Sequence, residues 1–173
     1  MRKSIFTFIT SSFFCLTIQA QTTMITPPYL QKGDTVAILA TARKHIVKSM
    51  QPTIDLLESW GLHVVIGKTV GLEENQLAGT DLDRAADLQE QLDNPNIKAI
   101  WCARGGYGTV RVVDLVDFTE FKKNPKWLVG FSDVTVLHNH LNTMGYKSIH
   151  GIMPISLAKA TPEAIESLRL SLF

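Results

Sequence analysis

Short apolar runs alternate with amphipathic segments along most of this 173-residue chain. The run TVAILAT at 35–41 does not alternate apolar and polar residues, which is typical of a strand covered on both faces. Similar runs are found at 63–69, 97–103, 127–131 and 147–152. Strands that alternate with helices through short loops predict an α/β fold with a mainly parallel sheet.

The segments between these runs have apolar residues at helical spacing. Pro52 places the start of the first helix near Gln51, and Gly61 ends it. Further helices are expected over 81–92, over 133–144 with Gly145 as C-cap, and around Val110, Val113, Leu115 and Val116. The expected architecture is an open, mainly parallel sheet with helices on both faces, a flavodoxin-like or Rossmann-like layering.

The N-terminal segment differs from the rest of the chain. Residues 1–20 combine a basic start with an apolar stretch that ends at Ala20, which predicts a secretory signal peptide. An uncleaved membrane anchor is the alternative, although the apolar stretch is short for a span. Residues 21–33 form a polar lead-in, and 34–173 form one α/β domain. We therefore expect an exported protein, periplasmic or in the cell envelope, without stable membrane insertion once the signal is removed.

The formal charge argues against nucleic-acid binding. The whole chain has a net charge of +1, and removal of residues 1–20 leaves −1. No cluster of lysines and arginines is interleaved with aromatic residues. The mature chain keeps a single cysteine, Cys102, whose apolar neighbours predict a buried strand residue.

Ser132 follows the apolar run at 127–131 and precedes the helix expected over 133–144. A serine on such a strand-to-helix turn is exposed at the carboxyl edge of the sheet, beside free N–H groups of the next helix. Ser132 is therefore a candidate nucleophile, with the backbone N–H of Asp133 facing an oxyanion. The second glycine of G-x-S-x-G is replaced by Val134. The alternative interpretation is an N-cap serine, with Asp133 interacting with the helix dipole.

A glycine-rich loop, Arg104–Gly108, follows the strand expected at 97–103. Glycines there allow a ligand to approach the backbone, and Arg104 could pair with a carboxylate. A tight turn with a solvated arginine is the alternative, and the spacing does not match the phosphate-binding motifs. None of the five histidines is singled out as catalytic, and no metal-binding spacing is present.

The final segment begins with Thr161-Pro162-Glu163, a typical helix start, and continues with apolar residues to Phe173. A chain that stops inside an apolar helix is expected to depend on a further segment or a partner.

Several of these pieces together resemble one family, the serine LD-carboxypeptidases (muramoyltetrapeptide carboxypeptidases, peptidase family S66, including the microcin-immunity branch). The resemblance covers about residues 27–173. The most specific pieces are Arg-Gly-Gly-Tyr-Gly at 104–108 and Gly-Phe-Ser-Asp at 130–133, in this order and separation. The remaining pieces are residues 27–38, 78–81, 83–89 and 150–151.

The resemblance implies a serine hydrolase with a Ser–His–Glu triad and no cofactor or metal. It implies that Ser132 is the nucleophile, that the N–H groups of Asp133 and of Gly105 or Gly106 form the oxyanion hole, and that Arg104 contacts substrate. The implied substrate is the peptidoglycan tetrapeptide, whose terminal D-alanine is removed. Family members that recycle peptidoglycan act in the cytoplasm, so the resemblance implies a cytoplasmic location as the alternative to export.

The family's glutamate and histidine come from a C-terminal domain that is absent here, so the chain alone is expected to be a poor enzyme. Two alternatives remain open: an amidase acting on aminoacyl or peptidyl nucleotides, and a non-catalytic domain that binds cell-wall peptides. The oligomeric state is also open, a homodimer included.

Overall fold

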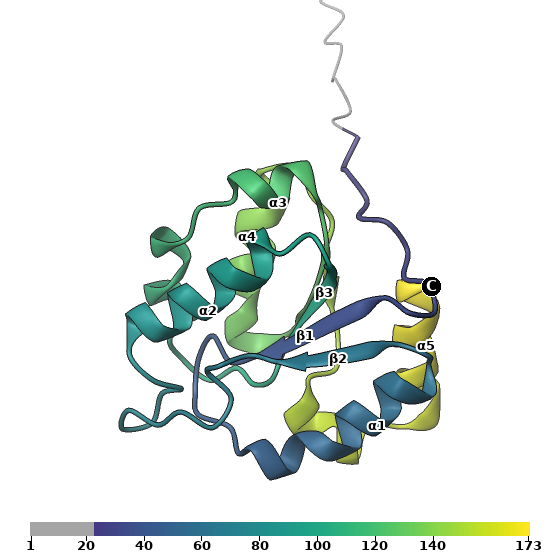
Figure 1. The fold of residues 1–173 in the computed structure, drawn as a ribbon, viewed down its shortest axis with the longest axis horizontal. Helices are drawn as coiled ribbons and strands as arrows, with labels where there is room; N and C mark the ends of the chain where they lie inside the picture. The colour runs from purple at the N-terminus through teal and green to yellow at the C-terminus, as the bar shows by residue number, and fades with distance from the viewer. Residues whose placement is uncertain (1–22) are drawn as a thin grey trace, which may run out of the picture.

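The computed structural model describes residues 23–173. The predicted signal peptide at 1–20 lies outside these residues. Five strands form one parallel sheet in the order β2-β1-β3-β4-β5 (Figure 1). Their bounds are β1 Thr35–Leu39, β2 His63–Ile66, β3 Ile97–Cys102, β4 Trp127–Gly130 and β5 Ile149–His150.

The helices cover both faces of the sheet, as the sequence predicts. Helices α2 (Asp81–Asp93), α3 (Thr119–Lys123) and α4 (Thr135–Thr143) lie on one face, and α1 (Gln51–Ser59) and α5 (Pro162–Leu172) on the other (Figure 1). The chain winds outward from β1 to β2 and then crosses to β3 on the other side of β1. The carboxyl ends of β1 and β3 therefore flank the switch point, the place where such sheets bind ligands.

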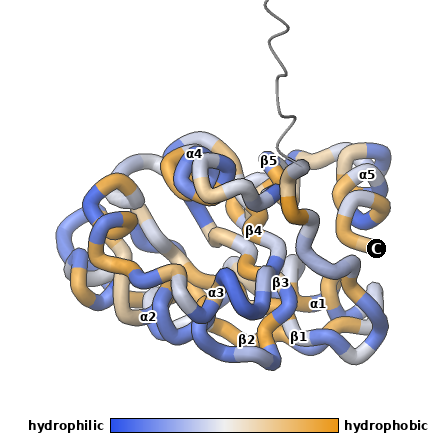
Figure 2. Tube along the Cα trace, turned by 90° about the horizontal axis from the view of Figure 1, so that it is seen from above, coloured by the Kyte–Doolittle hydropathy of each residue, from blue (hydrophilic) through white to orange (hydrophobic). Residues whose placement is uncertain are grey.

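The central strands supply both hydrophobic cores, because successive side chains point to opposite faces. In β1, Ala37 and Leu39 join the core under α2 and α4, and Val36 and Ile38 join the core under α1 and α5. Figure 2 shows these apolar stretches lying between the helices. Cys102 is completely buried, and burial raises the pKa of its thiol to about 12.

Several element boundaries agree with the sequence. Helix α1 starts at Gln51 next to Pro52 and is preceded by a short 3₁₀ turn, η1 (Val47–Met50). Thr161 caps α5 by accepting a hydrogen bond from the N–H of Ala164. Leu168 and Leu172 of α5 are buried in the second core, whereas Leu170 is 64% exposed.

The prediction of a helix around Val110–Val116 was wrong. The segment forms two 3₁₀ turns, η2 (Thr109–Arg111) and η3 (Val113–Leu115), and α3 follows them without having been predicted. Val110 and Leu115 are about half-exposed, so apolar spacing in this segment does not mark one buried face. The last strand is also shorter than predicted, because only Ile149 and His150 pair with β4, and the chain then turns into η5 (Pro154–Lys159).

Candidate functional site

Ser132 occupies a strained turn directly after β4. Its φ is +61°, in the left-handed region that non-glycine residues rarely adopt. Its side chain is exposed, while the flanking Gly130 and Val134 are buried. A Cβ at position 130 would lie 2.8 Å from a Val134 methyl, so the turn closes tightly around glycine. The surrounding packing therefore fixes the elbow that presents the Ser132 hydroxyl.

The Ser132 hydroxyl does not cap a helix. Ser132 is the first residue of η4 (Ser132–Val134), which has no side-chain cap. Helix α4 then begins at Thr135 with Val134 as its N-cap residue. Within residues 23–173 no hydrogen bond engages this hydroxyl. The N-cap interpretation is therefore wrong for this residue, and its hydroxyl is free for another partner.

Gly105 packs directly against the elbow, because β3 and β4 are neighbours and both loops leave the same edge of the sheet. A Cβ at position 105 would lie 3.3 Å from the Asp133 nitrogen and 3.4 Å from the Ser132 Cβ. The N–H groups of Gly105, Gly106 and Asp133 donate no hydrogen bond to any described residue. The structure thus places three free backbone donors in the two adjoining loops beside an exposed hydroxyl, an arrangement suited to developing negative charge.

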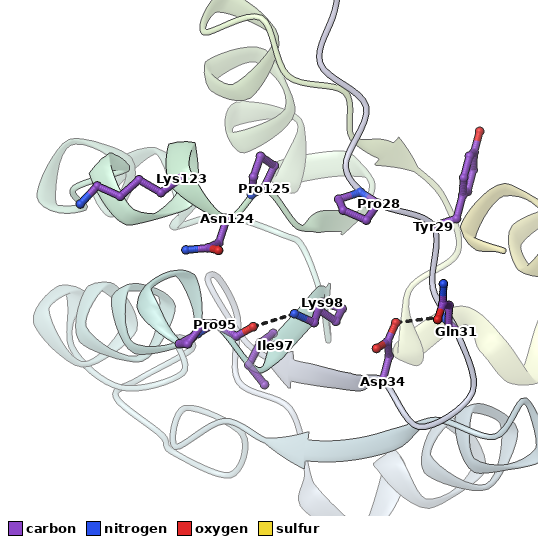
Figure 3. A pocket seen from close by; sticks show the side chains of 10 residues that line it. All are labelled: Pro28, Tyr29, Gln31, Asp34, Pro95, Ile97, Lys98, Lys123, Asn124 and Pro125. Carbon is purple, nitrogen blue, oxygen red and sulfur yellow. Dashed lines mark hydrogen bonds between the residues drawn. The ribbon is translucent and has the colours of Figure 1, made fainter.

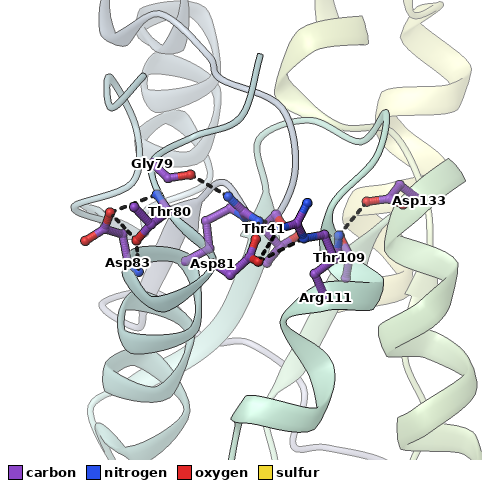
Figure 4. A network of polar contacts seen from close by, with 9 residues as sticks. Thr41, Gly79, Thr80, Asp81, Asp83, Thr109, Arg111 and Asp133 are labelled. Atoms are coloured by element: carbon purple, nitrogen blue, oxygen red, sulfur yellow. Dashed lines mark hydrogen bonds and ion pairs between the residues drawn. The ribbon is translucent and has the colours of Figure 1, made fainter. Parts of the chain in front are cut away.

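Asp133 connects the elbow to the glycine loop through its side chain. Its carboxylate accepts a 3.0 Å hydrogen bond from the N–H of Thr109, and the Thr109 hydroxyl lies 2.9 Å from that of Thr41 (Figure 4). Arg84, completely buried, donates to the carbonyls of Thr41 and Gly79 and pairs with Asp81. For the Asp133 side chain the sequence had indicated only a helix-dipole role; its contact to Thr109 depends on the register of β3 and β4.

Arginines flank the other side of the glycine loop. Arg104 is half-buried, and its guanidinium donates a long, 3.4 Å hydrogen bond to the Lys44 carbonyl. Burial, together with the nearby Arg104 charge, lowers the pKa of His45. Arg43, which the sequence analysis did not single out, lies against Gly106: a Cβ there would come within 2.6 Å of the Arg43 Cδ. Gly106 has a φ of +118°, so glycine is required on both grounds.

The histidines on α4 do not reach the Ser132 hydroxyl. His138 Nε2 lies 2.9 Å from the Gly130 carbonyl oxygen, and its Nδ1 lies 2.8 Å from the Ser148 Oγ. Burial is the main reason that the pKa of His138 is lowered. His140 stacks instead on Phe118, with ring centroids 4.6 Å apart. Among residues 23–173 no histidine or carboxylate is hydrogen-bonded to Ser132, so this part of the chain supplies no paired base.

Two hollows border the loops at the carboxyl edge. One, of 520 Å³, is lined by Phe131 and by residues from His150 to Ala164. The other, of 710 Å³, is lined by Arg104, His45 and Ile155 among others. A third hollow, of 310 Å³, lies at the amino edge of the sheet and is lined by Pro28, Tyr29 and Asp34 together with the segments 95–98 and 123–125 (Figure 3). That hollow is at the opposite end of the strands from Ser132.

In the described part of the chain, no group of three or more histidine, cysteine or acidic side chains could hold a metal ion. No helix there is long and apolar enough to cross a membrane.

Curated relatives have names that agree with the family indicated by the sequence. A protein of Bacillus subtilis named "Probable murein peptide carboxypeptidase" is 41% identical over 129 residues, which cover 73% of this chain and 40% of that protein. The "Murein tetrapeptide carboxypeptidase" of Pseudomonas aeruginosa is 33% identical over 141 residues, covering 77% of this chain and 46% of that protein. The matches thus span half or less of these relatives' lengths.

The fold also matches a solved structure. The microcin C7 self-immunity protein MccF, solved with aspartyl sulfamoyl adenosine, superposes with a TM-score of 0.76 at 24% identity, over 83% of this chain and 45% of that one. This similarity supports the α/β architecture. The family model described as the LD-carboxypeptidase N-terminal domain matches residues 36–151, from β1 to just past β5. The chain therefore belongs to the LD-carboxypeptidase family, peptidase family S66.

Proposed function

We propose that this chain is the nucleophile-bearing part of a serine carboxypeptidase that removes the terminal D-alanine from peptidoglycan tetrapeptides. One observation carries the proposal: the exposed Ser132 hydroxyl stands on a left-handed turn beside the free N–H groups of Asp133, Gly105 and Gly106. The names of the Bacillus and Pseudomonas relatives support the substrate class.

In this proposal, the Ser132 oxygen attacks the carbonyl carbon of the peptide bond before D-alanine. The three backbone N–H groups stabilise the negative charge on the carbonyl oxygen, and the amine of D-alanine leaves with a proton from the catalytic base. Water then cleaves the acyl–Ser132 ester and regenerates the hydroxyl. Arg104 contributes positive charge at the rim of the 710 Å³ hollow.

The base has to be supplied by residues outside the described part of the chain, since no described side chain is paired with Ser132. Loss of a triad member typically lowers the rate by several orders of magnitude. We therefore expect the isolated 173-residue chain to be nearly inactive, and a protein of the relatives' full length to be active.

The test measures D-alanine release from muramyl tetrapeptide by the full-length gene product and by its Ser132→Ala variant. We expect release by the parent protein and a loss of at least about 1,000-fold in the variant. Ser59→Ala is the matched control, because Ser59 is exposed at the end of α1 and its hydroxyl bonds only the Leu56 carbonyl.

Two results would overturn the proposal. Tetrapeptide binding without any D-alanine release, unchanged in Ser132→Ala, would indicate a binding domain. Hydrolysis of aminoacyl nucleotides in preference to the tetrapeptide would shift the substrate to the class that the MccF complex suggests for that relative.

We further propose that the protein acts in the cell envelope, on the strength of the signal-like residues 1–20. Fractionation of cells that express the gene should recover the protein outside the cytoplasm with its N-terminus at Gln21. Recovery of the unprocessed chain in the cytoplasm would contradict this.

A further inference from the structure

Arg43 lies at the switch point of the sheet, on the loop that leaves β1. The neighbouring loop, Arg104–Gly108, leaves β3, and the two loops pack together: Gly106 touches the Arg43 side chain and Gly108 approaches the Ala42 Cα. Ligands of doubly wound sheets bind between these two strand ends. Arg43 is therefore placed where the fold exposes its binding crevice, and it lies against Gly106, the residue that follows the Gly105 that packs on Ser132.

The Arg43 guanidinium has a donor group without the hydrogen-bond partner that arginine donors normally have. Its Nε is buried and has no hydrogen-bond partner, and no described carboxylate forms an ion pair with it. A buried N–H left unpaired lowers stability, so such groups usually have a partner. An arginine Nε is also one of the two donors that hold a carboxylate in bidentate fashion.

Three of the other cations near this edge form ion pairs. Arg84 and Arg111 both pair with Asp81, and Lys44 pairs with Glu73. Arg104 donates to the Lys44 carbonyl and lines the hollow beside His45. Arg43 is thus the cation next to the glycine loop with an unused buried donor.

We propose that Arg43 binds the C-terminal carboxylate of the peptide substrate and so selects for cleavage of a single terminal residue. This inference rests on the proposed function. The carboxylate of the released residue lies one residue, about 3.5 Å along the chain, beyond the scissile bond. In the structure the two contacts fall on adjacent residues: Gly105 lies against the Ser132 elbow, and the next residue, Gly106, lies against Arg43.

The experiment compares two substrates in the full-length protein, the tetrapeptide with a free C-terminal carboxylate and the same peptide as its C-terminal amide. The parent protein should prefer the acid. Arg43→Met should lose about 10–100-fold in kcat/KM on the acid, mainly through KM, and little on the amide, so that the preference disappears. Arg43→Lys should restore part of the preference, because it keeps the charge without the bidentate geometry.

Two further variants make the test specific. Arg104→Met should keep the ratio between acid and amide, whatever its effect on overall activity. Lys48→Met, at an exposed lysine on η1, should leave both values unchanged. Because the readout is a ratio measured within each variant, a folding defect does not imitate the expected result. A preserved ratio in Arg43→Met, or its loss in Arg104→Met alone, overturns the proposal.

A binding measurement distinguishes failure of the Arg43 assignment from failure of the proposed function. Calorimetry with the Ser132→Ala protein compares the affinity for acid and amide peptides without turnover. Tighter binding of the acid that is lost in Ser132→Ala/Arg43→Met supports the assignment even if D-alanine is not released. Equal binding of both peptides, or no binding of either, overturns it.

Discussion

The backbone N–H of Thr109 donates a 3.0 Å hydrogen bond to the carboxylate of Asp133, joining the loop after β3 to the residue that follows Ser132. Thr109 is completely buried, so this N–H has no access to water as a substitute partner. The bond holds the glycine loop and the elbow together. The positions of the free N–H groups on both sides of Ser132 thus depend on the Asp133 side chain.

Removal of the Asp133 carboxylate should destabilise the fold. In Asp133→Ala the buried N–H of Thr109 loses its acceptor, and we expect the free energy of unfolding to fall by about 1–3 kcal/mol. Asp133→Asn keeps an acceptor oxygen and should lose less. Urea unfolding of the chain measures both. Asp114→Ala, at an exposed position on η3, is the control and should stay within about 0.5 kcal/mol. An equal loss at both sites would contradict the role of this bond.

The left-handed backbone of Ser132 gives a second stability prediction. A Cβ at φ +61° is unfavourable by about 1 kcal/mol, a penalty that glycine avoids. Ser132→Gly should therefore unfold with a higher free energy than Ser132→Ala, by about 1 kcal/mol, although both lack the hydroxyl.

At Ser59 the same two substitutions should have the opposite order of stability, with the alanine variant the more stable. Ser59 is helical, and glycine in a helix is less stable than alanine by about 0.5–1 kcal/mol. Thermal or urea unfolding of the four variants compares the two sites directly. If glycine is the less stable replacement at both, then Ser132 is not strained in solution.

The sequence alone predicted the layers of the fold because its strongest signals are local. The apolar runs, Pro52, Gly61 and the Thr161 cap each act on neighbouring residues, and each agrees with the structure. The segment after Gly108 was mistaken for a helix because valines at helical spacing also suit consecutive 3₁₀ turns, in which Val112 and Val113 are buried.

The contacts around the candidate site were harder to predict, since they join segments far apart in the sequence. The Arg43–Gly106 contact requires that β1 and β3 be neighbours, and the Thr109–Asp133 bond requires the register of β3 and β4. Neither residue type nor spacing signals them. A sequence-level indication existed only for Arg43, as a charged residue shortly after the first strand, at an edge where ligands bind.

Lys126 is a buried lysine that closes the C-terminal end of α2. It is 1% exposed, and its ammonium group donates hydrogen bonds of 2.7–3.0 Å to the carbonyls of Gln91, Leu92 and Asn94. Lys126→Met keeps the apolar stem but leaves three carbonyls without this donor. We expect a loss of about 2–4 kcal/mol in the free energy of unfolding, measured by urea denaturation.

Lys98→Met is the matched control for this substitution. Lys98 is exposed and bonds a single carbonyl, that of Pro95, at 2.9 Å, so the loss should be below about 1 kcal/mol. A small effect at Lys126 would mean that water replaces its three hydrogen bonds.

His138 should make stability depend on pH below about 6.5, the ordinary pKa of histidine. Burial, opposed in part by the hydrogen bond to the Gly130 carbonyl, holds its pKa below the ordinary value of 6.5. Between the two pKa values the unfolded chain binds more protons than the folded one, so stability rises with pH in this window and falls as pH drops through 6.5. His45, whose pKa is lowered by burial and by Arg104, acts in the same direction.

Urea unfolding at pH 7.5 and 5.5 should therefore show a smaller pH-dependent loss of stability in His138→Gln than in the parent chain, and the smallest loss in His45→Gln/His138→Gln. His63→Gln, at an exposed position of β2, should keep the full dependence. An undiminished loss of stability at pH 5.5 in the double variant would show that other groups, and not these two histidines, are responsible.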